Sequence, residues 1–188
     1  VKIASLEEAE QHIAGAEPDA HGLTVLPFIA GERSPNWAGH AHAAIVGLSL
    51  HHNPTDIVQA CLEAVAYQVA LMYELLQPVA RNAKEIVASG GALLNSPSWV
   101  QMMSDVLCQP VTASGEAEAS SRGVAALALE RLGVIASVDD LPSTFGKTYV
   151  PQPDRHERYQ AARERQATLY DLLVRQRWDL ARPRVSKS

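Results

Sequence analysis

The sequence predicts an α/β fold, in which helices pack on the faces of a sheet. Short apolar segments alternate with longer segments of helical spacing, in the order strand, strand, helix, strand, helix, strand, helix. The chain has 188 residues, of which 47% are hydrophobic and 20% charged, so it carries enough apolar side chain for a buried core.

A short helix and two buried strands are expected first. Residues 5–14 should be helical, because Ser5 can cap the helix and Glu8 completes a capping box. The runs LTVLPFIA (23–30) and AAIVGLSL (43–50) are apolar and bounded by turn residues, as in buried strands. Pro27 marks a strand end or an edge strand.

The two strands are joined by a polar loop that contains GERSPNW (31–37). Glu32 and Arg33 in this loop are candidates for contact with a substrate or with a partner domain. The alternative is a local ion pair on the surface, which would contribute at most ~1 kcal/mol to stability.

The longest helix is expected from Asn53-Pro54 to about residue 77, where apolar residues recur at helical spacing. Glu63 lies on the apolar face of this helix. It therefore has either a structural hydrogen bond or a catalytic role.

The second half continues the alternation. We expect a strand at EIVASGG (85–91), a helix at 96–109 that Ser96 caps, a short strand at 110–113 and an Ala-rich helix at 116–133. Three prolines make 134–154 loop-like, and 155–178 should form a charged helix that docks on the domain. The last ten residues are expected to be disordered.

The Gly pair in ASGGALLNSPSW (88–99) is the sharpest local feature. Glycines between a strand and a helix let the backbone approach a ligand closely, and the helix that begins near Ser96 offers unpaired N–H groups. A tight turn that needs a positive φ is the alternative explanation.

Composition excludes several classes of protein. The net charge of −5 and the pI of about 5.8 argue against a nucleic-acid binder, and no segment approaches the ~18 apolar residues of a membrane span. Cys61 and Cys108 form no CxxC pair and no export signal is visible, so we expect a reducing, cytoplasmic location. No metal site is expected, because the spacings of four histidines match no zinc pattern: His40, His42, His51 and His52.

Four segments together resemble the C-terminal domain of the FGGY family of carbohydrate kinases. AAIVGLSLHHNPTDIVQACLE (43–63) resembles the second signature of that family, with a mild departure at Cys61. LPFIAGERSPNW, SGGALLNSPSWVQMMSDVLCQPV and EAEASSRGVAALALERLG resemble further blocks, and together they cover about residues 22–133 in family order.

This resemblance implies an actin/Hsp70/sugar-kinase ATPase fold of the ribonuclease H-like type, with a mixed sheet flanked by helices. It implies that Gly90, Gly91 and Ala92 line the nucleotide and that Asn95 approaches the adenine. ATP and Mg²⁺ are the implied cofactors. Residues 1–150 would form the nucleotide-binding domain, and 151–188 a helix and tail that pack on it.

The resemblance also places the general-base Asp and most sugar contacts in an N-terminal domain, of which we find no counterpart. The absent initiator Met is a further hint of a fragment. We therefore expect the ATP-binding half of a carbohydrate kinase, inactive without its other lobe, and a homodimer remains open.

The GERSPNW loop resembles gluconate kinases first and xylulose kinases second. Two alternatives to this kinase half differ in class: a stand-alone nucleotide-binding module without catalysis, and a protein-interaction module that binds no nucleotide.

Overall fold

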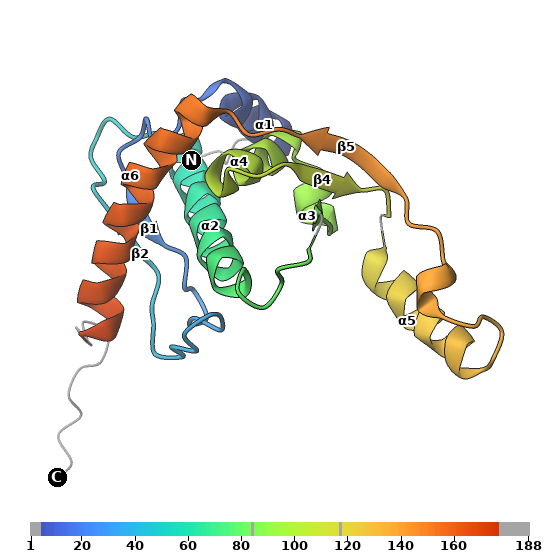
Figure 1. The fold of residues 1–188 in the computed structure, drawn as a ribbon. Helices are drawn as coiled ribbons and strands as arrows, with labels where there is room; N and C mark the ends of the chain where they lie inside the picture. Colours follow the sequence, from blue (N-terminus) through green and yellow to red (C-terminus); the bar gives the residue numbers. More distant parts are fainter. Residues whose placement is uncertain (1–4, 84, 117, 177–188) are drawn as a thin grey trace, which may run out of the picture.

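The computed structural model describes residues 5–83, 85–116 and 118–176 of the chain (Figure 1). The elements follow in the order α1 (Leu6–Gly15), β1 (Thr24–Leu26), β2 (Ala44–Val46), α2 (Pro54–Leu76), β3 (Ile86–Ala88), α3 (Gly91–Leu94), α4 (Pro97–Leu107), β4 (Val111–Ser114), α5 (Ala119–Arg131), a 3-10 turn η1 (Val138–Asp140), β5 (Phe145–Tyr149), α6 (Pro153–Tyr170) and a π-helical turn η2 (Asp171–Arg175). None of the helices in these ranges is long and apolar enough to cross a membrane.

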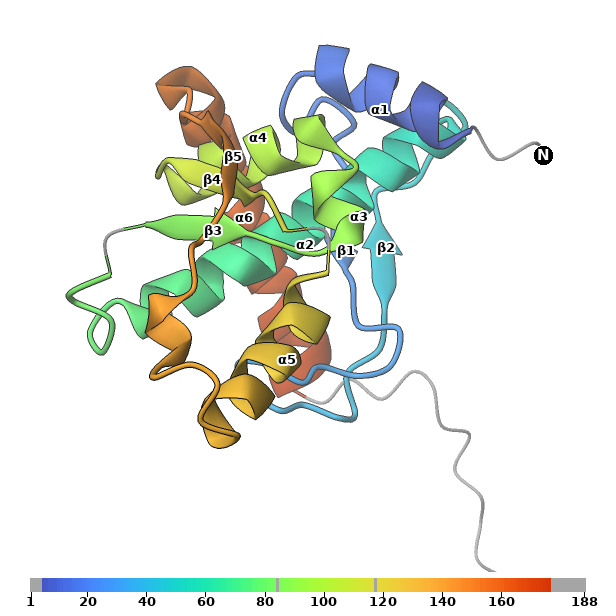
Figure 2. The ribbon, with the colours of Figure 1, turned by 90° about the vertical axis from the view of Figure 1, so that its right-hand side faces the viewer.

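The strands form two separate sheets. β1 and β2 pair antiparallel, whereas β3, β4 and β5 form a mixed sheet in which β3 and β4 run parallel and β4 and β5 antiparallel. Helix α4 packs on one face of the mixed sheet, and α5 stands apart at the far end of β4 and β5 (Figures 1 and 2). The predicted α/β class with a mixed sheet is confirmed, although the strands divide between two sheets.

The predicted helix starts are confirmed because each depends on neighbours in the sequence. Ser5 and Glu8 form a complete capping box at α1, and Asn53 and Asp56 form another at α2. Ser96 caps α4 through the backbone N–H of Trp99.

Strand β5 corrects the expectation that residues 134–154 are loop-like. Four of its five residues are exposed and only Tyr149 is buried, so it shows no apolar run. It exists because it pairs with β4, where Thr112 and Thr148 also join their hydroxyls at 2.9 Å. Such an edge strand depends on a partner over 30 positions away, which local patterns do not reveal.

Other boundaries differ by a few residues. β1 ends at Leu26, directly before Pro27, and the charged helix α6 starts at Pro153 and ends at Tyr170. The Ala-rich helix is shorter than expected, at Ala119–Arg131. The expected disordered tail lies outside the described residues.

The main core lies where α1, α2, α4 and α6 meet. Its buried residues come from all four helices: Ile13, Ala66, Tyr67, Ala70, Met102, Met103, Val106, Tyr159 and Ala162. Tyr67 of α2 and Tyr159 of α6 meet edge to face at 6.1 Å between ring centroids. α6 therefore packs on the body of the fold, while a domain boundary at residue 150 remains a prediction.

The Glu63 carboxylate is the polar centre of this core and is 1% exposed. Its oxygens accept hydrogen bonds from the backbone N–H of Asp19 at 3.2 Å, Gln59 Nε2 at 2.8 Å, Tyr67 Oη at 3.0 Å and His21 Nε2 at 3.2 Å. Because the Leu23 N–H donates to His21 Nδ1, the ring proton of His21 lies on Nε2. Burial and the Glu63 charge raise the pKa of Tyr67, which keeps its hydroxyl a donor.

Glu63→Gln should lower the free energy of unfolding by about 2 kcal/mol, since an amide group would replace one carboxylate oxygen and face two donors. Urea unfolding measures this loss. Glu157→Gln, on the exposed side of α6, is the matched control and should change stability by less than about 0.5 kcal/mol. Equal stability of the two variants would contradict the central role of Glu63.

Candidate functional site

The Gly pair lies at the carboxyl end of β3, which is where ligands gather in open α/β sheets. Gly90 has a φ of +99°, and Gly91 is the first residue of the short helix α3. The pair therefore leads into α3, and not directly into the helix at Ser96 as expected.

The two glycines serve different needs. Gly90 adopts a φ that L side chains rarely take, which supports the tight-turn explanation at this position. Gly91 has no such φ, and a Cβ built on it would meet only Asn95 Nδ2, at 3.9 Å. No turn geometry requires a glycine at 91, so the open space above it is the feature that favours a ligand.

The structure brings all four predicted nucleotide contacts together on one exposed turn. Gly90, Gly91, Ala92 and Asn95 are all exposed, and Asn95 ends α3 with its backbone N–H bonded to the Gly91 carbonyl at 3.0 Å. Because Asn95 is exposed, its side-chain amide is accessible to a ligand. An amide in this position can both donate to and accept from an adenine edge.

The start of α4 does not offer the free N–H groups that the sequence suggested. Glu10 of α1 accepts from Ser96 Oγ at 2.5 Å and from the Ser98 N–H at 2.8 Å. This carboxylate already occupies the positive end of the helix. Its effect is to hold α1 against the segment that follows the Gly pair.

A cavity of about 600 Å³ lies beside the Gly pair, between the mixed sheet and α5. Val87 and Ser89, which directly precede Gly90, form part of its wall. From α5 come Arg122, Gly123 and Leu127. The turn thus borders a hollow that is large enough for part of a nucleotide.

The two candidate residues of the loop, Glu32 and Arg33, differ in their burial. Glu32 is 3% exposed and accepts from Tyr170 Oη at 2.5 Å and Asn36 Nδ2 at 3.0 Å. Burial and this carboxylate raise the pKa of Tyr170 to about 12. Arg33 is exposed, so it is the member of the pair that can reach a ligand.

Two of the four histidines that drew attention in the sequence contact backbone carbonyls through their side chains. His52 Nε2 pairs with the His21 carbonyl at 2.8 Å, and His40 Nε2 with the Val174 carbonyl at 3.2 Å. Within residues 5–83, 85–116 and 118–176, the group with metal-ligand composition is Asp19, His21 and Glu63, whose ligand atoms lie within 4.8 Å of one another.

Sequence reasoning missed His21, and it identified Glu63 only as a buried carboxylate. The two residues are 42 positions apart, so no local spacing links them. Glu63 already accepts four hydrogen bonds, and Asp19 Oδ1 pairs with Arg165 Nη2 at 2.5 Å. These bonds account for the cluster as a structural centre.

Relatives of known function share this sequence over much of its length. The chain is 31% identical to glycerol kinase 1 of Thermotoga maritima over 70% of the chain and 27% of that protein. It is 33% identical to a gluconokinase of Bacillus licheniformis, over 72% of the chain and 26% of that protein. The chain thus spans about a quarter to a third of the length of the curated relatives it matches.

Solved structures share the fold. A xylulose kinase from Rhodospirillum rubrum superposes with a TM-score of 0.71 at 28% identity, over 89% of this chain and 34% of that one. A structure described as a xyloylose kinase from Brucella ovis gives 0.75 at 23% identity, over 90% and 35%. The ribonuclease H-like expectation for the fold is thereby confirmed.

The family model for the C-terminal domain of the FGGY family of carbohydrate kinases matches residues 3–130. This match includes the Gly pair, the second signature and all but the last residue of α5. The chain therefore belongs to the FGGY family of carbohydrate kinases and carries its C-terminal domain.

Proposed function

We propose that this chain is the ATP-binding half of a carbohydrate kinase that transfers the γ-phosphate of ATP to a hydroxyl group of a sugar or sugar acid. The observation that carries the proposal is the open Gly91 position at the carboxyl end of β3. A glycerol kinase of Plasmodium falciparum with this fold, 21% identical, was crystallised with ADP, which makes ADP the first nucleotide to test.

In this proposal the nucleotide lies against the exposed turn. Gly91 lets the nucleotide approach the backbone without a side chain between them, and the Asn95 amide hydrogen-bonds the adenine. Gly90 holds the turn in the required conformation. Each residue thus binds or positions the nucleotide, and none takes a proton from the sugar.

Phosphoryl transfer also needs a base and a metal ion close to the γ-phosphate. Mg²⁺ is commonly held by substrate phosphates together with one or two carboxylates, and segment 88–99 contains no carboxylate. We therefore propose that Mg²⁺ arrives with the nucleotide, and that the family's N-terminal domain supplies the Asp that acts as general base.

For the acceptor we propose gluconate first and xylulose second. The support is the GERSPNW loop, in which exposed Arg33 suits the carboxylate of a sugar acid better than a neutral ketose. The relatives include glycerol kinases, gluconokinases and xylulose kinases at similar identity, so the loop is the feature to test.

Gly91→Val should weaken binding of Mg²⁺-ADP to this chain at least about tenfold, because the added methyl groups would fill the space that the nucleotide occupies. Titration calorimetry measures the binding. The unfolding temperature should stay within about 2 °C of the original, since a Cβ at this exposed position meets no protein atom closer than 3.9 Å.

Two further variants separate binding from stability. Gly15→Val, also in open space and without a positive φ, should bind ADP normally. Gly90→Ala should lower the free energy of unfolding by about 1–2 kcal/mol, because Ala resists a positive φ. Saturable binding that survives Gly91→Val would refute the site. If no variant binds, the same titration on a protein that carries both family domains decides, and continued absence of binding there would favour an interaction module.

Arg33→Ala should raise the KM for gluconate about tenfold and leave that for xylulose nearly unchanged, because only gluconate offers a carboxylate. Steady-state kinetics on a protein that carries both family domains, with gluconate, xylulose and glycerol as acceptors, measures the difference. Equal loss for all three acceptors would remove the basis for preferring gluconate.

A further inference from the structure

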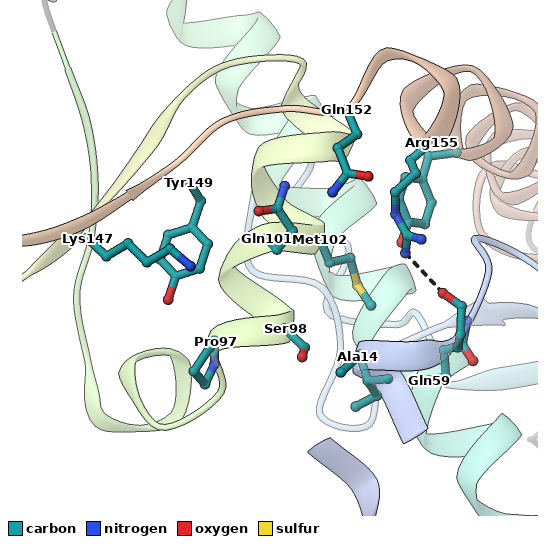
Figure 3. A pocket seen from close by; sticks show the side chains of 13 residues that line it. Ala14, Gln59, Pro97, Ser98, Gln101, Met102, Lys147, Tyr149, Gln152 and Arg155 are labelled. Atoms are coloured by element: carbon teal, nitrogen blue, oxygen red, sulfur yellow. Dashed lines mark hydrogen bonds between the residues drawn. The ribbon is translucent and has the colours of Figure 1, made fainter. Parts of the chain in front are cut away.

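A second cavity, of about 350 Å³, lies where α1, α4, β5 and the start of α6 converge (Figure 3). It is formed by residues from five elements and the loops beside them: Ile13, Ala14, Ala16, Gln59, Pro97, Ser98, Gln101, Met102, Lys147, Tyr149, Gln152, Arg155 and Tyr159. Its volume is within the usual range for small-molecule sites.

The lining of this cavity is polar and includes two cations, although the amide N–H groups of Gln59 and Gln101 already donate to other protein atoms. Lys147 and Arg155 contribute cations, while Gln59, Gln101 and Gln152 contribute amides, and no lining residue is acidic. In the view of Figure 3, the two cations lie at opposite ends and the amides of Gln101 and Gln152 lie between them. This is unusual in a chain whose net charge is −5.

The nearest carboxylates are already engaged by other groups. Asp105, which is fully buried, accepts from Arg155 Nε at 3.1 Å, from the Gln152 N–H at 2.9 Å and from Gln101 Nε2 at 2.8 Å. Glu10 accepts from Ser96 and Ser98, as described above. Asp105 thus neutralises Arg155, and neither carboxylate pairs with Lys147.

Lys147 is the cation that remains available. It is exposed, and no ion pair within the described ranges involves it. Its Nζ lies 4.6 Å from the centroid of the Tyr149 ring, which keeps the ammonium group at the cavity wall. Arg155, by contrast, is paired with Asp105 and donates to the Ala16 carbonyl at 3.1 Å.

We propose that this cavity binds a small hydroxylated organic anion, a carboxylate or a phosphate ester. Lys147 pairs with the charged group, and the Gln152 amide and the Ser98 hydroxyl hydrogen-bond the hydroxyl groups. The site is distinct from the proposed nucleotide turn, since none of Gly90, Gly91, Ala92 or Asn95 lines it. Only Asn95 and Ser96 separate α3 from Pro97, the first lining residue of α4.

The test titrates citrate, as a carboxylate probe, and inorganic phosphate, as a phosphate probe, into the chain at constant ionic strength. NMR amide shifts and calorimetry follow the binding. We expect saturable 1:1 binding of at least one probe with a Kd of about 1 mM or tighter, and the probe that binds identifies the class of anion. Shifts should centre on Ser98, Gln101 and Tyr149.

Lys147→Glu should weaken this binding about tenfold or more, and Lys147→Arg should retain it. Arg131→Gln, which removes an exposed cation from α5, is the matched control and should bind normally. Because Lys147 is exposed, these variants should fold as the original chain does, which circular dichroism checks.

Gly91→Val should leave the anion site intact, so loss of nucleotide binding and loss of anion binding are separate results. Absence of saturable binding by both probes would overturn the proposal. So would binding that Lys147→Glu leaves unchanged, because the charge would then be recognised elsewhere.

Discussion

The arrangement of the helices depends on the hydrogen bonds that the buried carboxylate of Glu63 accepts. It joins α2 to the loop at Asp19 and His21, and α2 in turn packs against α4 and α6. A buried charge is costly unless every lone pair finds a donor, and here four donors meet two oxygens. The network therefore specifies one packing of α2, and the position of α4 follows from it.

Two sets of contacts fix the position of the Gly turn relative to the packed helices. Val100 of α4 packs with Ala88 of β3 and Val111 of β4, which fixes the end of the strand beside the helix. Glu10 then ties α1 to Ser96, directly after the turn. The turn itself stays exposed while both of its flanks are held, which is the preorganisation that a backbone-lined ligand site needs.

Whether a feature could be predicted from the sequence depends on how far apart its interacting residues lie along the chain. The caps at Ser5, Asn53 and Ser96 join residues two or three positions apart, so the pattern alone located three helices. The His21–Glu63 pair and strand β5 depend on partners more than 30 positions away, and they were missed. Lys147 lies on strand β5, which places this residue beside α4. The proposed anion cavity therefore could not be predicted from the sequence.

Helix α5 exposes apolar side chains next to the proposed nucleotide turn. Val124 and Leu127 of α5 and Leu132, directly after it, are 70%, 62% and 76% exposed. Exposure of apolar surface costs about 25 cal/mol per Å², which favours its contact with other protein. Helix α5 borders the 600 Å³ cavity beside the Gly turn. Protein that packs on this part of α5 would therefore also border the proposed nucleotide turn, because Leu127 and Ser89 line the same cavity.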